Sequence, residues 1–545
     1  MIKRLAWFLL VVLPVPSTAQ MSQHPYQPGI DVLHYNFALD LPDTGSVIHG
    51  DATILFRRTT AIRTLKLDLF GLQVSAVSLN GATVRFDRDS STLRISLPPV
   101  GHSALPDTMT AEVVYAGPVT DGLIIRTDGD GRWTAFGDNW PNRARHWLPT
   151  VDHPSDKATV TWDVTAPANR TIIANGSLER RIPLSFDASA RVRTIWSCHR
   201  PLPTYVMVIA AAPLVYRNLG VSAVNNSEFP GGVQQALYTF PGQSPGTFGV
   251  FDSAISIVNY FSGVFGPFPY EKLAHCQSST IFGGMENASA IFYYDRGFRT
   301  HSITDNLIAH ETAHQWFGDA VTPRTWPNLW LSEGFATYCA ELWREHSRGD
   351  SVFRASMASM RSRVIRSTLT ARRPVLDTAE TNLLALLNSN SYQKGAWILH
   401  MLRSLLGDDA FFHSLRSYYA DFRHATAVSE DLRNECERIS GKDLGWFFDQ
   451  WLRRPGYIDG QLTWKVRRNQ GVLELTMLQG ATFPPYRFPL TLELNHRDGT
   501  TERRSIEVRA VHETTVEIPW KDVHPPERII ADPDVTLLGN IAVVE

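Results

Sequence analysis

The residues with the clearest chemical potential are two histidines and two glutamates near the middle of the chain. His310 and His314 flank Glu311 in a His-Glu-x-x-His sequence, and Glu333 follows after eighteen intervening residues. On a helix, positions i and i+4 are about 400° apart, so both imidazoles project from one face and can share a metal ion. A catalytic zinc ion usually takes three protein ligands and keeps a fourth position for water. The pattern therefore predicts a Zn²⁺ site at His310, His314 and Glu333, with Glu311 beside the open position.

The alternative interpretation is a chance pentapeptide on a surface helix. At ordinary residue frequencies, a His-Glu-x-x-His with a glutamate at one set distance arises in about one chain in several hundred of this length. The metzincin signature is excluded, because Phe317 and Ala320 stand where it needs glycine and histidine. A zinc site of another class is therefore the preferred interpretation.

Two helices must present these side chains. The helix that carries His310 is predicted to end at residues 316–318, residues 322–328 have the composition of a loop, and a second helical pattern begins at residues 329–333. Asp305 is the predicted cap of the first helix. Packed side by side, the two helices would bring Glu333 to the histidines.

The period changes between residues 245 and 452, where helical patterns dominate from Asp305 on, and alternating patterns lie on both sides of this part. Residues 35–41 alternate strictly, residues 74–79 lead through Asn80-Gly81 into residues 82–86 as a hairpin, and residues 158–164 and 204–210 alternate again. Residues 20–217 are therefore predicted to form a large antiparallel β-domain.

The helical part is predicted to begin with an amphipathic helix at residues 248–261 and to end with a helix at residues 447–452, before Pro455-Gly456. Residues 473–477 and 488–494 alternate again, which predicts a small β-sandwich over residues 456–545. The predicted fold class is multidomain α+β. It comprises an N-terminal antiparallel β-domain, a mainly helical catalytic domain and a C-terminal β-sandwich.

Length and charge limit the remaining function classes. The chain has 545 residues, 43% of them hydrophobic, which is enough for several ordinary cores. Its net charge of −2 gives no electrostatic reason to expect a nucleic-acid partner. The four cysteines are scattered, so buried free thiols are expected, although one disulfide remains open. They are Cys198, Cys276, Cys339 and Cys436.

The first nineteen residues have the pattern of a signal peptide. Two basic residues precede an apolar run at residues 5–13, and Ser17 and Ala19 offer small side chains at −3 and −1 of a cleavage site. The alternative is an N-terminal membrane anchor, but the run is short and two prolines interrupt it. We expect cleavage, export to the periplasm or secretion, and no integral membrane segment in the mature chain.

Several motifs together resemble the M1 family of zinc aminopeptidases, which are gluzincins. The thermolysin branch places its glutamate one residue further on, so the spacing here favours M1. The similarity runs from about residue 30 to residue 545 in family order. The motifs are the zinc sequence at residues 310–314 with Glu333 inside residues 331–338, the Gly-x-Met-Glu-Asn motif at residues 283–287, residues 391–396 and residues 147–154. The resemblance implies a thermolysin-like catalytic domain at residues 218–455, one Zn²⁺ per chain, and peptide substrates with free N-termini.

The resemblance also implies a substrate-binding role for the Gly-x-Met-Glu-Asn segment. Glu286 would face the free α-ammonium, since a charge-assisted pair is favoured over an uncharged mid-chain amide. Gly283 and Gly284 would let the substrate backbone approach, and Met285 and Asn287 complete the segment. Without the family, the same stretch reads as a glycine turn beside a solvated glutamate.

Three further roles follow from the resemblance. Glu311 would take a proton from the zinc-activated water and pass it to the leaving amine, and Tyr392 would donate a hydrogen bond to the oxyanion. On its own, Tyr392 reads as a core tyrosine near a helix start. Asp319 either orients a ligand histidine or is a solvated residue at a helix end.

The chain departs from the family pattern at the pocket for the N-terminal residue. Family members usually carry a glutamine there, with glutamine or glutamate two places on. Counting back from Ala144-Arg145 places Asp138 and Trp140 at these positions. If the register holds, Asp138 shares the ammonium with Glu286 and Trp140 narrows the pocket.

A second departure is the end of the sequence. Many M1 proteins continue into a large helical domain that roofs the active site, so we expect a more open cleft here that admits longer peptides unless a second subunit covers it. The expected function is a zinc-dependent aminopeptidase. The alternatives are an epoxide-hydrolase-like M1 relative and a non-catalytic peptide-binding or scaffold protein on an M1 fold. The oligomeric state remains open.

Overall fold

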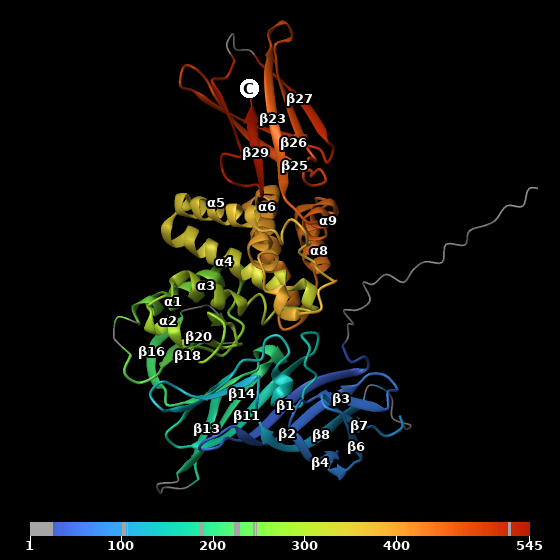
Figure 1. The fold of residues 1–545 in the computed structure, drawn as a ribbon, viewed down its shortest axis with the longest axis vertical. Coiled ribbons are helices and arrows are strands. Elements are labelled where there is room, and N and C mark those ends of the chain that lie inside the picture. Colours follow the sequence, from blue (N-terminus) through green and yellow to red (C-terminus); the bar gives the residue numbers. More distant parts are fainter. Residues whose placement is uncertain are drawn as a thin grey trace, which may run out of the picture.

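The chain folds into three successive parts that are stacked along its long axis (Figure 1). The structure is a computed structural model that describes residues 26–544 except 101–104, 106, 185–189, 223–228, 244–245, 247 and 521–524. The predicted signal peptide at residues 1–19 lies outside the described residues. An N-terminal β-domain, a central mainly helical domain and a C-terminal β-domain follow in sequence order. This arrangement confirms the predicted multidomain α+β class.

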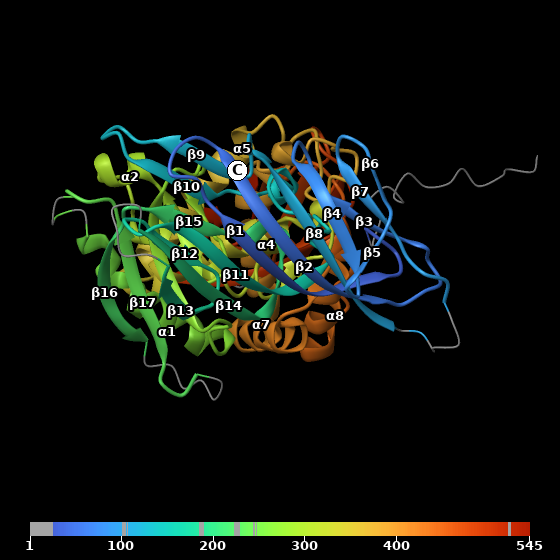
Figure 2. The same ribbon diagram turned by 90° about the horizontal axis from the view of Figure 1, so that it is seen from below.

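The N-terminal domain is built on one large twisted sheet that lies beneath the helices (Figure 2). Its strand order is β13-β14-β11-β1-β2-β8-β4-β5. The pairing is antiparallel apart from β1 with β11, which is parallel, so the predicted antiparallel domain contains a parallel pair. The strands are β1 Ile30–Asp40, β2 Val47–Arg58, β4 Gln73–Leu79, β5 Ala82–Thr83, β8 Asp107–Pro118, β11 Lys157–Pro167, β13 Ser177–Pro183 and β14 Arg191–Pro203.

Smaller sheets complete this domain. In the predicted hairpin, Asn80 and Gly81 both have positive φ, at 49° and 79°, which is the requirement of a tight primed turn between β4 and β5. One small sheet contains β9 Leu123–Thr127, β10 Trp133–Gly137, β12 Thr171–Ala174 and β15 Ile209–Ala212, and another contains β3 Thr64–Asp68, β6 Phe86–Arg88 and β7 Thr92–Ser96. The segment after β10 contacts the central domain, and the segment after β15 leads into its first strand.

The central domain opens with a sheet and continues as helices. Its sheet has the order β16-β17-β18-β20-β19. Its first strand, β16, begins at Val215, three residues before the predicted boundary at residue 218. The strands are β16 Val215–Ser222, β17 Val233–Thr239, β18 Lys272–Ser278, β19 Gly284–Met285 and β20 Ala290–Tyr294, and the short pair is β21 Thr322–Pro323 with β22 Thr426–Ala427. The helices are α1 Ala254–Phe265, α2 Asp295–Arg299, α3 Asp305–His314, α4 Trp330–Arg348, α5 Asp350–Arg366, α6 Gly395–Leu406, α7 Asp408–Phe422, α8 Ser429–Ser440 and α9 Gly445–Leu452.

A close contact between two glycines sets the position of α4 against the start of α6. A Cβ added to Gly334 would lie 2.9 Å from the backbone of Gly395 and 3.1 Å from the carbonyl oxygen of Ser391. Only glycine allows two backbones to approach this closely. The contact places the π-helical turn Asn390–Lys394, which precedes α6, against the second turn of α4. π-helical turns of this kind are frequent at functional sites.

The C-terminal part consists of two sheets with the orders β27-β24-β23-β29 and β26-β25-β28. It contacts the central helices through Arg361, which donates to Asp532 at 2.7 Å, and through His400, whose Nε2 lies 3.0 Å from the Val535 carbonyl. The strands are β23 Ile458–Arg467, β24 Val472–Gln479, β25 Phe488–Asn495, β26 Thr501–Val508, β27 Glu513–Pro519, β28 Arg528–Ala531 and β29 Gly539–Val544.

A half-buried lysine joins the N-terminal domain to the central one. Lys157, at the start of β11, donates from Nζ to the carbonyl oxygens of Asp319, Ala320 and Ala425 at 2.9, 2.8 and 3.2 Å. The first two carbonyls belong to the loop that follows α3. The large sheet therefore holds the end of the helix that carries the His-Glu-x-x-His sequence.

The described residues also test smaller predictions. The four cysteines all lie in the described part of the chain and are buried and free, as expected. The helix predicted at residues 248–261 begins later, at Ala254, after a 3₁₀ turn at Gly249–Ser253. Among the described residues, no helix is long and apolar enough to cross a membrane.

Candidate active site and metal centre

Helix α3 presents both histidines of the predicted zinc site. Its N-cap is Thr304, whose hydroxyl accepts from the Leu307 amide at 3.1 Å, so the predicted cap Asp305 is instead the first helical residue. The prediction was wrong by one position because threonine, like aspartate, accepts from the amide of N3. His310 and His314 lie one turn apart, with their Nε2 atoms 3.2 Å from each other.

Helix α4 brings Glu333 to these two nitrogens. Its Oε2 lies 3.4 Å from His310 Nε2 and 3.3 Å from His314 Nε2, and it is buried without a hydrogen-bond partner in the described part of the chain. Tetrahedral zinc at about 2.0–2.1 Å from each ligand separates the ligands by about 3.3–3.4 Å. All three separations are close to this spacing. The residues therefore fit a zinc ion.

The electrostatics favour a cation at the same point. Burial lowers the pKa of His314, but the carboxylates of Glu286 and Glu333 outweigh this effect and raise its pKa to about 10. The protein therefore creates a strongly negative potential at the histidine. This negative potential would stabilise a divalent cation that coordinates Nε2 in place of a proton.

The orientation of His314 is set through its other ring nitrogen. Nδ1 lies 2.9 Å from the Ser332 hydroxyl and 3.3 Å from the Phe317 carbonyl, which leaves Nε2 free for the metal. Gly318 makes room for this contact: its φ is 136°, and a Cβ there would lie 2.6 Å from the Ser332 hydroxyl. The turn after α3 therefore needs a glycine for both conformation and space.

Glu311 lies against the Gly-Gly-Met-Glu-Asn segment. A Cβ on Gly284 would lie 2.2 Å from Glu311 Oε1, so only a residue without a side chain at this position leaves room for the carboxylate. Burial raises the pKa of Glu311 well above its usual range. A buried carboxylate with a raised pKa is suited to accept a proton at neutral pH.

Glu286 is held beside Glu311 by Gln315, the residue that follows α3. Gln315 donates to the Glu286 carbonyl at 2.8 Å and accepts from the Ser289 amide at 2.7 Å, which ties both ends of the segment to the metal helix. The potential ligand atoms of Glu286, Glu311 and His314 all lie within 4.8 Å of one another. Burial raises the pKa of Glu286 to about 7.

Tyr392 lies on the π-helical turn, above the metal ligands. Its ring is stacked on His310 with 6.0 Å between the centroids and 7° between the planes. Burial and the nearby Glu333 carboxylate raise its pKa well above the usual range, so the phenol keeps its proton. The hydroxyl is therefore available as a hydrogen-bond donor.

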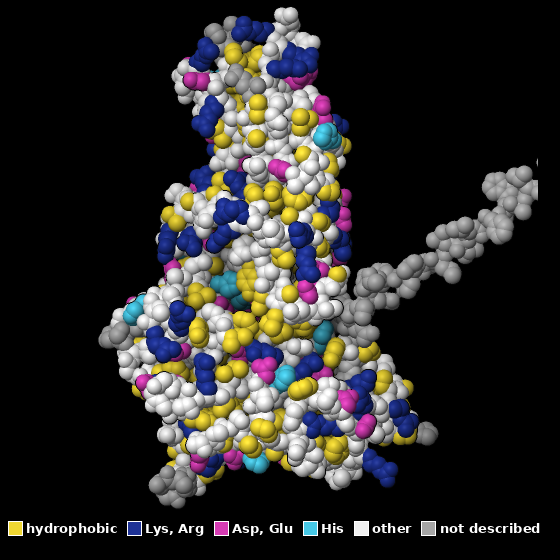
Figure 3. All heavy atoms as spheres, in the orientation of Figure 1, with side chains coloured by type: hydrophobic (Ala, Val, Ile, Leu, Met, Phe, Trp, Pro, Cys, Tyr) yellow, Lys and Arg dark blue, Asp and Glu magenta, His cyan; other side chains and the backbone are white. Residues whose placement is uncertain are grey.

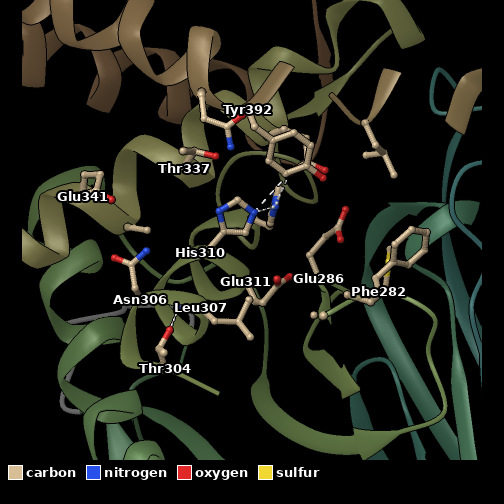
Figure 4. A pocket seen from close by; sticks show the side chains of 18 of the residues that line it. Phe282, Glu286, Thr304, Asn306, Leu307, His310, Glu311, Thr337, Glu341 and Tyr392 are labelled. Carbon is tan, nitrogen blue, oxygen red and sulfur yellow. Dashed lines mark hydrogen bonds and ion pairs between the residues drawn. The ribbon is translucent and has the colours of Figure 1, made fainter. Parts of the chain in front are cut away.

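These groups meet in one cavity of about 430 Å³. Figure 3 shows that the surface is hollowed between the helices and the N-terminal domain, and Figure 4 shows that Glu286, Glu311, His310 and Tyr392 converge in it. The cavity brings together nearly all of the site residues predicted from the sequence, namely His310, His314, Glu333, Glu311, Tyr392, Gly283, Gly284, Met285 and Glu286.

Comparison with known proteins assigns the chain to a family. Residues 32–206 match the Peptidase M1 N-terminal domain, and residues 250–451 match the Peptidase family M1 domain. The chain belongs to peptidase family M1. It is 27% identical over 475 residues to probable aminopeptidase 2 of Sulfurisphaera tokodaii, covering 81% of this chain and 57% of the relative.

Further relatives of this M1 chain support the same assignment. It is 25% identical to leucyl aminopeptidase of Saccharolobus solfataricus, covering 79% of this chain and 55% of the relative. The chain therefore spans little more than half the length of these curated relatives. Among solved structures, a variant of the M1 zinc metallopeptidase of Deinococcus radiodurans matches with a TM-score of 0.69 and 28% identity, covering 79% of this chain and 96% of that one. Together with the ligand cluster, these relatives establish zinc as the cofactor of this M1 chain.

One predicted substrate-binding residue, Asp138, lies outside the cavity of this M1 protein. Asp138 is buried behind the cavity wall, where its carboxylate accepts from Arg143 at 2.6 Å and from Thr280 and the Ile281 amide at 3.2 Å. With these partners it shapes the turn before Gly283 and does not face the cavity. Trp140 does line the cavity, as predicted.

Asn287 and Asp319 also differ from their predicted roles. Asn287 is fully buried and does not line the cavity. The amide of Asp319 donates to the His314 carbonyl at 3.0 Å, but in the described part of the chain its side chain makes no hydrogen bond to a ligand histidine and does not face solvent. It is fully buried, and its Oδ2 accepts from Gln315 at 2.9 Å. The histidine is oriented by Ser332 instead.

Sequence reasoning missed Gln315, Ser332 and Gly318. Each acts through a contact that depends on the packing of α3 against α4 or against the segment at residues 283–289. The adjacency of Ser332 to Glu333 was visible in the sequence, but nothing in the sequence indicated which histidine nitrogen the hydroxyl would face.

Proposed function

We propose that this M1 chain is a zinc-dependent aminopeptidase that hydrolyses the N-terminal peptide bond of peptides. The observation that carries the proposal is the position of Glu286, whose carboxylate lies within 4.8 Å of Glu311 and of the zinc-ligand candidate His314. A substrate ammonium paired with Glu286 places the first peptide bond beside the metal site. An endopeptidase has no use for a buried carboxylate at this point, because a mid-chain peptide carries no charge there.

The zinc ligands in the proposal are His310, His314 and Glu333. When bound, zinc would supply Lewis acidity, which makes a water molecule nucleophilic near neutral pH and polarises the scissile carbonyl. Glu311 acts as the general base. It accepts the proton of the attacking water at its carboxylate and delivers it to the leaving amine.

Tyr392 stabilises charge on the substrate. Its protonated phenol donates a hydrogen bond to the carbonyl oxygen of the first peptide bond as negative charge develops there. The π-helical turn aims the hydroxyl over the ligands, because the contact between Gly334 and Gly395 fixes this turn on α4. Orientation of the donor before reaction lowers the reorganisation cost of catalysis.

The Gly283–Met285 backbone completes the pocket. Gly284 and Met285 form the edge strand β19, which pairs on one side with Tyr293 and Phe292 of β20. Its other edge is available to pair with an extended peptide. Such backbone pairing would align the substrate whatever its side chains are. Trp140 and Phe282, whose ring centroids are 6.1 Å apart, border the pocket for the N-terminal residue.

The location of the protein is a further part of the proposal. The pattern at residues 1–19 supports export to the periplasm or secretion after cleavage behind Ala19. Expression of the full chain in a bacterial host, followed by N-terminal sequencing of the extracytoplasmic protein, tests it. A mature chain that starts at Gln20 is the expected result, and retention of Met1 on a membrane-associated protein contradicts it.

Hydrolysis of aminoacyl-coumarin substrates, compared with their N-acetylated forms, tests the proposed activity. We expect cleavage only of the free-amine substrates. Glu311→Gln should lose about 10²–10⁴ in kcat while keeping its zinc, measured by elemental analysis. Glu286→Gln should raise KM strongly. Glu517→Gln, an exposed glutamate of β27, is the control and should match the wild type.

Two outcomes contradict the proposal. Cleavage of N-acetylated peptides at internal bonds would make the protein an endopeptidase and remove the role given to Glu286. Zinc binding with no turnover of any free-amine substrate would instead favour the peptide-binding alternative.

A further inference from the structure

The cavity has two chemically different ends. Figure 4 places Glu286 and Phe282 on one side of His310, and Asn306, Thr337 and Glu341 on the other. The second side is formed by the start of α3, the middle of α4 and the face of α5 that carries Met360 and Arg363. If the substrate ammonium pairs with Glu286, the part of the peptide beyond the cleaved bond must lie toward this second side.

Arg363 is a cation at this far end with no counter-charge of its own. It lines the cavity, is exposed, and makes no hydrogen bond or ion pair with any residue that the structure describes. The other arginines of α5 behave differently where they face acidic groups: Arg354 pairs with Asp534 and Arg361 with Asp532. The guanidinium of Arg363 is therefore available to an anion that enters the cavity.

The neighbouring carboxylate does not neutralise this cation. Glu341 also lines the far end, but it pairs with Arg344 at 2.9 Å on its own helix. The far end therefore keeps a net positive charge, whereas the Glu286 end is negative. A cavity with this charge separation is complementary to a short zwitterionic peptide.

We propose that Arg363 binds the C-terminal carboxylate of short peptide substrates, which makes tri- and tetrapeptides with a free carboxylate the preferred substrate class. This inference rests on the proposed aminopeptidase function. Arginine suits the role because its planar guanidinium can donate two parallel hydrogen bonds to a carboxylate. Longer peptides can still enter through the open mouth of the cavity, but their carboxylate lies beyond Arg363.

The cavity has room for a short extended peptide along α4. Glu341 lies eight residues beyond Glu333 on the same helix, which corresponds to about 12 Å at a rise of about 1.5 Å per residue. An extended peptide covers about 3.3–3.6 Å per residue, so roughly three residues fit along this wall of the cavity.

The test compares matched peptides that end in a carboxylate or in an amide. The substrates are tripeptides, tetrapeptides and octapeptides whose N-terminal residue is the one preferred in the coumarin assay. For the wild type, we expect kcat/KM to be about five- to tenfold higher for the acid than for the amide in the tri- or tetrapeptide, mainly through KM. The ratio should be near one for the octapeptide, since its carboxylate lies outside the cavity.

Variants of two arginines on α5 locate the effect. Arg363→Gln should bring the acid-to-amide ratio to about one, and Arg363→Lys should keep part of it, because lysine retains the charge but not the paired donors. The control is Arg366→Gln, which removes an exposed arginine of the same helix that does not line the cavity and should keep the wild-type ratio. Calorimetric binding of the same tripeptides to Glu311→Gln gives a readout without turnover, and the Kd ratio should follow the kinetic one.

The outcomes separate the two proposals. If coumarin substrates are cleaved but the acid-to-amide ratio is near one, or if Arg363→Gln leaves a high ratio unchanged, the assignment of Arg363 is wrong and the aminopeptidase activity stands. An octapeptide with the same ratio as the tripeptide would also overturn it. Failure to cleave any free-amine substrate would instead count against the proposed function.

Discussion

The close approach of Gly284 to Glu311 leads to a sharp prediction. The three atoms nearest to a Cβ built on Gly284 are Oε1, Cδ and Cγ of Glu311, at 2.2, 2.4 and 2.6 Å. Carbon atoms in contact are normally about 3.5–4.0 Å apart. In Gly284→Ala, the Glu311 side chain must therefore move by about 1 Å or more. The backbone of Gly284 does not lie in the left-handed region, so alanine adds this contact without backbone strain.

The expected effect is a loss of turnover with the metal site intact. A displacement of about 1 Å at a reacting group costs about 10²-fold in rate, and loss of a general base costs about 10²–10⁴. We therefore expect Gly284→Ala to lower kcat by about a hundredfold. Zinc content should stay at one per chain, because none of the three nearest atoms belongs to a zinc-ligand candidate.

The neighbouring glycine provides the matched control. A Cβ on Gly283 meets nothing within 4 Å, so Gly283→Ala makes the same chemical change without touching Glu311. We expect it to keep most of kcat, with any effect on substrate approach visible in KM. The assay is steady-state hydrolysis of an aminoacyl-coumarin, with zinc content and thermal unfolding recorded for each variant. A Gly284→Ala protein that keeps kcat within threefold of the wild type, or a pair of variants with equal losses, would refute the reasoning.

Three further predictions concern the supports of the site. Gly334→Ala places a Cβ 2.9 Å from the Gly395 backbone, which cannot rotate away, so the free energy of unfolding should fall by about 1–3 kcal/mol and kcat should fall with the shifted π-helical turn. Ser332→Ala removes the hydroxyl that lies 2.9 Å from His314 Nδ1 and should weaken zinc affinity at least tenfold in a chelator competition. Burial lowers the pKa of His275 from 6.5 to about 3, so the unfolded chain binds more protons between these values. The resulting stability is complete above pH 6.5 and decreases as pH falls toward 3, by at most about 1.4 kcal/mol per pH unit, in denaturant titrations.

Each of these predictions has its own control. Gly263→Ala adds a methyl group to open space on α1 and should leave unfolding and kcat unchanged. Ser505→Ala removes an exposed hydroxyl of β26 and should not alter zinc affinity. His275→Gln should flatten the pH dependence, whereas the surface variant His413→Gln should not. Unchanged stability in Gly334→Ala, unchanged zinc affinity in Ser332→Ala, or parallel pH curves for the wild type and His275→Gln would contradict the respective argument.

Much of the site could be predicted from the sequence, because the residues that form each motif are close together along the chain. The spacing of His310 and His314 places both rings on one helical face whatever surrounds the helix. The alternation of residues 35–41 predicts a half-buried strand, and Asn80-Gly81 predicts a hairpin within residues 74–86, because backbone conformation at two residues decides the turn. The spacing also predicted Glu333, and the family resemblance added Glu286 and Tyr392, all of which the structure brings into the same cavity.

Other features depended on contacts between distant segments. Asp138 could be placed near the pocket by counting residues, but its direction was decided by Arg143 and by Thr280, which is 142 residues away. Gln315 and Ser332 act only because α3, α4 and the segment at residues 283–289 meet. The same holds for the glycine contact that fixes the π-helical turn. None of these pairings leaves a periodic signal in a single sequence.

The three-part architecture, the metal-binding helix and the chemical types of the groups at the site could therefore be predicted from residue order alone. Tertiary structure decided which oxygen or nitrogen of each group faces the cavity, and which group is already satisfied by a neighbour. It also brought Arg363, which belongs to no motif, to the end of the cavity opposite Glu286. The physical reason is that residue type and local period follow the chain, whereas hydrogen-bond partners, burial and the electrostatic field depend on the three-dimensional packing of segments that are distant in sequence.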